Sequence, residues 1–248
     1  MCGRFTLRAP ASQIAEQFAV FDMPDLKPRF NIAPTQPVPV LRLRPSGDGG
    51  GSAAKQPGGR GGHGQTSGEA GPPRELVLLH WGLIPHWAKD PAIGNRMINA
   101  RSETVAEKPA YKAALRRRRC LVLADGFYEW KKTSSGKQPY FFHLADDRPF
   151  AFAGLWESWE GPDHSYIESC TLLTGEPNEV VRPIHDRMPV ILAPDEYPRW
   201  LDPTIADIDR LSPLLAPYPA AEMRARAVSR AVNSPRTDDP RCIEPVEA

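Results

Sequence analysis

Residues Cys120 to Trp130, CLVLADGFYEW, carry the strongest indication of how this chain folds. The apolar run 120–124 is typical of a buried strand. Asp125-Gly126 predicts a turn, after which residues 127–130 continue as a second strand. Glu129 alternates with aromatic neighbours there, so it is either a solvated strand residue or a buried carboxylate with a chemical role.

Short strands and a few helices are predicted on both sides of this stretch. The strands are expected at residues 38–43, 75–81, 139–144, 150–155, 169–174 and 188–192, and the helices at 10–18, 110–118, 195–201 and 208–214. The 28 prolines argue against long helices. The predicted fold class is therefore α+β, with residues 1–248 forming a single domain around a curved, mainly antiparallel β-sheet or open barrel with peripheral helices.

Residues 46–73 differ sharply in composition from the rest of the chain. They are rich in glycine and lack aromatic and large aliphatic side chains. Such a segment buries too little apolar surface to offset its chain entropy, so we expect a disordered Gly-rich loop insertion. It lies between the strands predicted at 38–43 and 75–81, which indicates an expanded hairpin loop rather than a domain boundary.

The bulk composition excludes several classes of protein. The chain has 248 residues, 41% of them hydrophobic, and a net charge of +1, so no global field draws it to polyanions. No signal peptide and no membrane-spanning stretch are evident, and we expect no membrane partner. The four cysteines lack disulfide or zinc-ligand spacing, which favours a reducing cytoplasm and predicts no metal site and no cofactor.

The chain begins Met1-Cys2-Gly3-Arg4. If Met1 is removed, Cys2 carries a free α-amine and a thiol in 1,2 relation, both partly nucleophilic near neutral pH. The amine can condense with an aldehyde, and the thiol can then close a thiazolidine ring. The same residue can instead attack an acyl carbon, as in N-terminal-nucleophile hydrolases. An ordinary cysteine behind a retained methionine is the third interpretation.

Seven motifs in order extend this N-terminal signal over nearly the whole chain outside 46–73. They are MCGRF (1–5), RFNIAPTQ (29–36), WGLIPHWAKD (81–90), INARSET (98–104), CLVLADGFYEWKK (120–132), IHDRMPVIL (184–192) and VSRAVN (228–233). With them the chain resembles the SRAP family (SOS response-associated peptidase), bacterial and eukaryotic proteins that shield abasic sites in single-stranded DNA.

The resemblance implies a mechanism and its catalytic residues. Cys2 would attack the C1′ aldehyde of a ring-opened abasic sugar and leave a thiazolidine DNA–protein crosslink, which is lyase-type Schiff-base chemistry. Glu129 would take the proton of the amine, His185 would act on the sugar ring oxygen or assist reversal, and Asn99 would orient the nucleophile or the sugar. Met1 would be lost through an aminopeptidase or through the chain's own autopeptidase activity.

The resemblance also implies a DNA interface. The residues expected to bind DNA are Arg4, Asn31, Trp87, Arg101 and Arg187. Trp81 is expected in the core, and the basic run Arg116–Arg119 as a solvated helix end rather than a DNA contact. The expected partner is single-stranded DNA containing abasic sites, bound by a monomer in the cytoplasm that is nucleoid-associated when on DNA.

Two other functions fit parts of the sequence. Class II glutamine amidotransferases also begin Met-Cys-Gly and use the cysteine as an N-terminal nucleophile, although none of their later motifs is evident here. A single-stranded DNA or RNA binding module in which Cys2 is incidental is the non-enzymatic alternative. A metal-dependent nuclease is disfavoured, because carboxylates and histidines do not cluster at ligand spacing.

Overall fold

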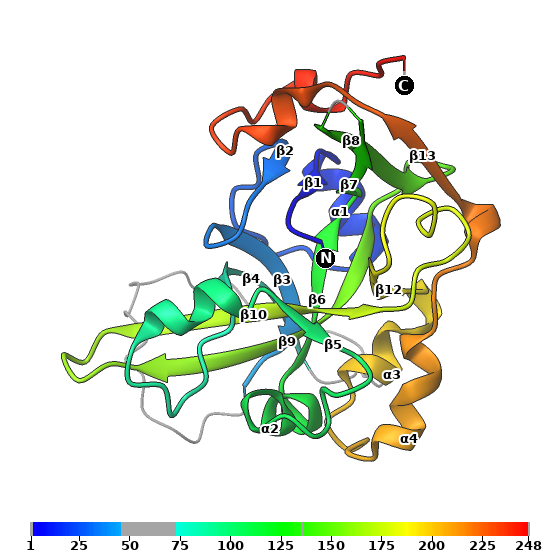
Figure 1. Cartoon of the computed structure of the whole chain (residues 1–248). Helices are drawn as coiled ribbons and strands as arrows, with labels where there is room; N and C mark the ends of the chain where they lie inside the picture. The colour runs from blue at the N-terminus through cyan, green and yellow to red at the C-terminus, as the bar shows by residue number, and fades with distance from the viewer. Residues whose placement is uncertain (1, 46–72, 135, 248) are drawn as a thin grey trace, which may run out of the picture.

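A computed structural model describes residues 2–45, 73–134 and 136–247. The predicted disordered loop at 46–73 lies, apart from Pro73, outside these residues. Two β-sheets form the body of the molecule (Figure 1). The helices are short, as the prolines predicted: α1 (Ala11–Phe18), α2 (Pro109–Arg117), α3 (Tyr197–Leu201) and α4 (Ile208–Leu211), with 3-10 turns η1 (Pro91–Arg96), η2 (Pro194–Glu196), η3 (Ser212–Leu215), η4 (Ala220–Glu222), η5 (Arg230–Asn233) and η6 (Pro240–Ile243). None of the helices in the described ranges is long and apolar enough to cross a membrane.

The first sheet has five strands in the order β13-β8-β7-β1-β2, all antiparallel. Their bounds are β1 (Phe5–Leu7), β2 (Arg29–Ile32), β7 (Gly126–Thr133), β8 (Gly136–Leu144) and β13 (Met223–Ala227). β7 and β8 form a hairpin whose register runs from Phe127 opposite Phe142 to Thr133 opposite Gly136. The N-terminal strand is therefore held in the middle of a sheet rather than at the edge of the fold.

The second sheet closes on itself. β3 pairs with β4, β4 with β10, β10 with β9, β9 with β6, and β6 with β3, and only the β4–β10 pairing is parallel. The bounds are β3 (Pro37–Leu43), β4 (Arg74–Trp81), β6 (Arg119–Ala124), β9 (Phe150–Glu160) and β10 (Tyr166–Gly175). The short strands β5 (Asn99–Arg101), β11 (Met188–Pro189) and β12 (Ile191–Leu192) pair with its members. The predicted α+β class with a mainly antiparallel sheet is thus confirmed, with a closed five-stranded barrel.

Asp125 marks the place where the chain passes from the barrel to the five-stranded sheet. β6 ends at Ala124 and β7 begins at Gly126, so the two halves of the 120–130 stretch belong to different sheets. Gly126 is required there, since a Cβ atom would lie 2.2 Å from the buried Phe141 ring. The Asp125 carboxylate accepts hydrogen bonds from the Thr6 hydroxyl and from the amides of Arg8 and Ala9. This junction therefore fixes β1 against both sheets.

One hydrophobic core connects the two sheets. Phe5 of β1 packs edge-on against Trp81 and Phe152, with ring centroids 5.0 Å and 5.7 Å apart. Trp81 is fully buried, as expected for a core residue, and its indole donates to the carbonyl of Ile98. The N-terminal end of the chain consequently lies in the middle of the molecule, as Figure 1 shows.

Some local expectations need correction. The helix expected at 208–214 ends at Leu211 and continues as a 3-10 turn, where Pro213 cannot donate a backbone hydrogen bond. Arg116 and Arg117 are exposed as expected, but Arg119 is buried at the start of β6. Its guanidinium donates to the carbonyls of Leu115, Trp200 and Asp202, so it ties helix ends to the barrel instead of facing solvent.

Candidate active site

The pairing of β1 with β7 places the N-terminus beside Glu129. Phe5 lies opposite Phe127, and the Tyr128 amide donates to the Arg4 carbonyl at 3.0 Å. The same antiparallel register, continued two residues beyond the Phe5–Phe127 pair, brings Gly3 opposite Glu129. Strand pairing alone thus brings residues from opposite halves of the sequence into one site.

Cys2 is fully buried at this point of the chain. Its thiol lies 3.6 Å from the Arg4 carbonyl oxygen, a weak hydrogen bond. Burial, with a smaller contribution from the nearby Glu129 carboxylate, raises the pKa of the thiol well above its ordinary value. The thiol is therefore protonated near neutral pH and becomes a nucleophile only when a base removes its proton.

Asn99 holds the backbone of Cys2 from the opposite side. It begins β5, which lies parallel to β10 with Asn99 opposite Leu172. Its side-chain Nδ2 donates to the Cys2 carbonyl at 2.7 Å, while its buried Oδ1 has no hydrogen-bond partner among the described residues. A buried acceptor of this kind costs free energy unless a ligand satisfies it, so the Asn99 Oδ1 is suited to receive a donor from a substrate or an amine.

Glu129 is a buried carboxyl group on β7, with 2% of its surface exposed. Desolvation raises its pKa to about 7, and the positive charge of the amino terminus opposes part of this rise. A carboxyl group with a pKa near neutrality can both accept and return a proton at working pH. The interpretation of Glu129 as a solvated strand residue is wrong.

His185 reaches Glu129 from the loop between β10 and β11. Its Nε2 atom lies 3.7 Å from Oε2 of Glu129. The loop is anchored by the backbone of His185, which donates to Val181, and by the Arg187 amide, which donates to the imidazole Nδ1 at 3.0 Å. Burial lowers the pKa of His185, so the imidazole is neutral at pH 7.

Arg4 and Asn31 form an internal pair. The Arg4 Nη1 donates to the Asn31 Oδ1 at 2.8 Å and to the Val232 carbonyl at 2.7 Å. Asn31 is fully buried, and its Nδ2 donates to carbonyls of the C-terminal segment at Val232, Ser234 and Thr237. In the free protein Asn31 thus orients Arg4 and ties β2 to the C-terminal segment. Its expected contact with DNA stays a prediction.

The two other arginines expected at the DNA lie near each other but differ in their bonding. Arg187 donates both Nη atoms to the Glu103 carboxylate, at 2.9 and 2.8 Å, and also to the Thr174 carbonyl. Arg101 at the end of β5 is exposed and contributes to lowering the pKa of Glu103, after the larger effect of the Arg187 hydrogen bonds. Positive charge therefore lies just outside the Asn99 side of the site.

Trp87 borders a hollow on that same side. A cavity of about 580 Å³ is lined by Trp87, Met97, Asn99, Arg101, Lys108 and Tyr111, among others. Trp87 is 53% exposed, so its ring offers an apolar face to solvent rather than to the core. The cavity combines aromatic faces and cations next to Asn99, the combination that single-stranded nucleic acids bind.

Sequence reasoning missed several residues that shape this region. The role of Asp125 was hidden because an Asp-Gly pair also marks an ordinary turn. Lys132 and Lys137 line a second cavity, of about 480 Å³, together with Glu129, Trp130, His185 and Asn233. Their signal in the sequence is a pair of lysines on either side of the short β7–β8 turn.

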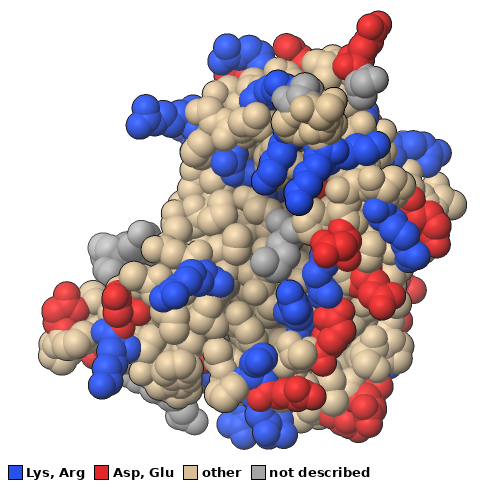
Figure 2. All heavy atoms as spheres, viewed as in Figure 1, with Lys and Arg blue, Asp and Glu red and all other residues tan. Residues whose placement is uncertain are grey.

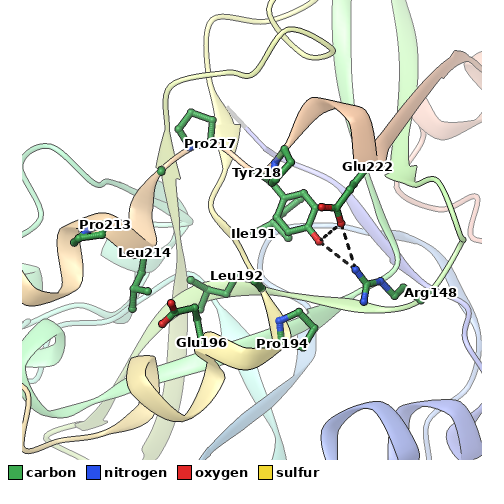
Figure 3. Close-up of a pocket in the computed structure, with 13 residues that line it drawn as sticks. Arg148, Ile191, Leu192, Pro194, Glu196, Pro213, Leu214, Pro217, Tyr218 and Glu222 are labelled. Atoms are coloured by element: carbon green, nitrogen blue, oxygen red, sulfur yellow. Dashed lines mark hydrogen bonds and ion pairs between the residues drawn. The ribbon is translucent and has the colours of Figure 1, made fainter.

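A separate hollow of about 270 Å³ contains none of the candidate site residues (Figure 3). Three of its polar side chains, those of Arg148, Tyr218 and Glu222, interact with one another. Tyr218 donates to Glu222 at 3.0 Å, and the Arg148 guanidinium lies 3.5 Å from the same carboxylate. This hollow is bordered largely by prolines and aliphatic side chains, so its arrangement supports packing rather than chemistry.

Comparisons with known proteins agree over nearly the full chain. A family model described as SOS response associated peptidase (SRAP) matches residues 1–235. The abasic site processing protein YoqW of Bacillus subtilis (strain 168) is 41% identical over 248 residues, covering 98% of this chain and 99% of the relative. The abasic site processing protein HMCES of Gallus gallus is 37% identical over 198 residues, covering 70% of this chain and 58% of the relative.

Two solved structures share the fold. A protein from Bacteroides thetaiotaomicron superposes with a TM-score of 0.79 at 22% identity, covering 99% of this chain and 100% of its own. A protein from Bordetella bronchiseptica superposes with a TM-score of 0.71 at 24% identity, covering 92% and 100%. At these identities the likeness supports the architecture alone.

Proposed function

This chain belongs to the SRAP family, and from that premise we propose that it processes abasic sites in DNA by joining Cys2 covalently to the abasic sugar in single-stranded DNA. The observation that carries the proposal is the burial of Cys2 between the Asn99 amide and the Glu129 carboxyl group, whose pKa of about 7 suits proton transfer. An N-terminal amine and thiol held beside such a group are equipped for attack on an aldehyde.

The reaction needs the α-amine of Cys2, so Met1 is first removed, by an aminopeptidase or by the chain itself. Glu129 accepts a proton from the ammonium group, and the amine adds to C1′ of the ring-opened sugar. The resulting carbinolamine loses its hydroxyl group as water, with the proton returned by Glu129. The thiol sulfur then adds to the imine carbon, and the thiol proton moves to the ring nitrogen. One C–N and one C–S bond form, and one water leaves.

His185 and Asn99 assist through their positions. His185, neutral and 3.7 Å from Glu129, can donate to the sugar ring oxygen and favour the open aldehyde form. The unsatisfied Oδ1 of Asn99 accepts from the amine or from a sugar hydroxyl and so orients the reacting pair. Holding both partners in place supplies the entropic part of the rate enhancement.

The strand would be held by charge and stacking around the lesion. Arg101 and Arg187 face flanking phosphates, with Arg187 exchanging Glu103 for phosphate oxygens, and Trp87 stacks on a neighbouring base. Arg4 completes the site from the Asn31 side. We still predict that the protein is a monomer, and that it is located in the cytoplasm and associates with the nucleoid when it is bound to DNA.

The test is a denaturing gel of the protein with an oligonucleotide that carries one abasic site. Wild type and Cys120→Ala should give a heat-stable shifted band, and Cys2→Ala should give none while still binding the DNA noncovalently. Cys120 is the matched control, since it is equally buried and lies in the barrel. Equal crosslinking by Cys2→Ala contradicts the proposal. Hydrolysis of glutamine without any crosslink would instead support the amidohydrolase alternative.

A further inference from the structure

The tip of the β7–β8 hairpin places two lysines face to face. Lys132 lies directly opposite Lys137 in the register, and both are exposed. Like charges in directly opposite positions destabilise a sheet. No ion pair within the described ranges involves either lysine; the salt bridges found there use arginine or histidine. The fold thus retains an uncompensated repulsion at this site.

Both lysines line a cavity that borders the candidate active site. They line the cavity of about 480 Å³ that also contains Glu129 and His185, named here the hairpin cleft. Half-buried Trp130 forms one wall, and its indole donates to the Asn233 side chain at 2.8 Å, which fixes the ring. The hairpin cleft therefore combines two free cations, a rigid aromatic ring and the proposed proton-transfer pair.

Positive charge extends over the same part of the surface. Figure 2 shows Lys and Arg side chains gathered in the upper part of the molecule, over the region where β7 and β8 lie in Figure 1. The net charge of the chain is only +1, so this is a local concentration. Local positive charge attracts a polyanion without making the whole protein a nonspecific binder.

We propose that the hairpin cleft binds the nucleotide that flanks the abasic sugar on the Glu129 side, with Lys132 and Lys137 sharing its phosphate and Trp130 contacting its base. This proposal rests on the proposed function and adds to it a binding site for the flanking nucleotide. Trp87 and Arg101 lie on the Asn99 side of Cys2, so the strand would have one arm on each side of the lesion. A phosphate between the two ammonium groups removes the repulsion that the free hairpin retains.

The test measures noncovalent binding by fluorescence anisotropy. The probe is a labelled single-stranded oligonucleotide with one tetrahydrofuran site, which lacks the aldehyde and cannot crosslink. For Lys132→Gln/Lys137→Gln we expect about tenfold weaker binding at low salt and a salt slope reduced by about 0.7, the contribution of the one phosphate that the two lysines share on a single strand. The matched control is Lys131→Gln, an exposed lysine of the same hairpin outside the cleft, which should leave the salt slope unchanged.

Truncated probes locate the contact. With nucleotides on only one side of the tetrahydrofuran site, the lysine substitutions should weaken binding to one probe and leave binding to the other unchanged. A double variant that behaves like Lys131→Gln, or that affects both truncated probes equally, overturns the proposal. Crosslinking to saturating abasic DNA tests the proposed function separately from the proposed role of the hairpin cleft. Absence of crosslinks by wild type refutes the proposed function, whereas the anisotropy results decide the cleft.

Discussion

The imidazole Nε2 of His185 lies 3.7 Å from the Glu129 carboxylate, and burial shifts the pKa values of the two groups in opposite directions. Burial raises the pKa of Glu129 to about 7 and lowers the pKa of His185 below its ordinary value. Near pH 7 the imidazole is therefore neutral and the carboxyl group titrates. Because its pKa lies near 7, the Glu129 carboxyl group can take up and release a proton during a single reaction.

We predict that Glu129→Gln slows crosslink formation by about 100-fold, the lower end of the usual range for general acid–base catalysis. The amide keeps the shape of the side chain but cannot accept a proton. In wild type the single-turnover rate should rise with pH through about 7, as the carboxyl group loses its proton. The variant should lack this inflection. An unchanged rate and pH profile would remove Glu129 from the proposed role.

The same substitution should increase stability at high pH. The folded pKa of Glu129 is raised from 4.5 to about 7, so the folded state binds the proton more tightly than the unfolded chain. The stability that comes from this tighter proton binding is fully present below the unfolded pKa of 4.5, and it is lost as the pH rises through the folded pKa of about 7. Glu129→Gln should therefore be more stable than wild type at pH 8, by on the order of 2 kcal/mol, and nearly equal at pH 4.5. Urea unfolding at both pH values measures this, and equal stability at pH 8 would contradict it.

Asp125→Ala should destabilise the fold by about 3 kcal/mol, because the Thr6 hydroxyl and two backbone amides lose their buried acceptor. Asp146→Ala is the matched control. Asp146 is exposed and forms a surface ion pair with Arg148, so its removal should cost less than about 1 kcal/mol. Urea midpoints of the two variants compare the costs. If they are equal, Asp125 does not fix β1 as described.

Replacing Gly47–Gly71 by two glycines should leave crosslinking within a few-fold of wild type. The β3–β4 hairpin is already closed at its base, where the Arg44 amide donates to the Pro73 carbonyl at 2.8 Å. A shorter connection also has a smaller closure entropy, worth about 1–2 kcal/mol of stability. A Gly–Ser segment of the original length is the control. A large loss of crosslinking in the shortened variant alone would show that the insertion is functional.

The sequence predicted the positions of strands and helices better than it predicted which strands pair with one another. Periodicity located most strands and helices, since it reports which residues are apolar. It did not show that residues 120–124 and 127–130 belong to different sheets, because sheet membership depends on long-range pairing. Arg119 was expected in solvent, since only the tertiary structure supplies the three carbonyls that satisfy it.

At the candidate site, too, the sequence predicted which residues are involved but not how they are buried and arranged. The motifs named Cys2, Asn99, Glu129 and His185, and the structure connects Asn99 to Cys2 and His185 to Glu129 directly. The burial that shifts the pKa values of Cys2 and Glu129 is not readable from residue types. Lys132 and Lys137 lie opposite each other because of the hairpin register, which the structure defines.

In the proposed reaction Cys2 becomes bonded to the abasic sugar through both its amine and its thiol. The most direct measurement is intact mass spectrometry of the protein after incubation with an oligonucleotide that carries one abasic site, followed by peptide mapping of the adduct. We predict a mass equal to the chain without Met1 plus the oligonucleotide minus one water, with the modification on Cys2. A chain that has lost Met1 but forms no adduct, or an adduct on another residue, would contradict the proposed reaction of Cys2.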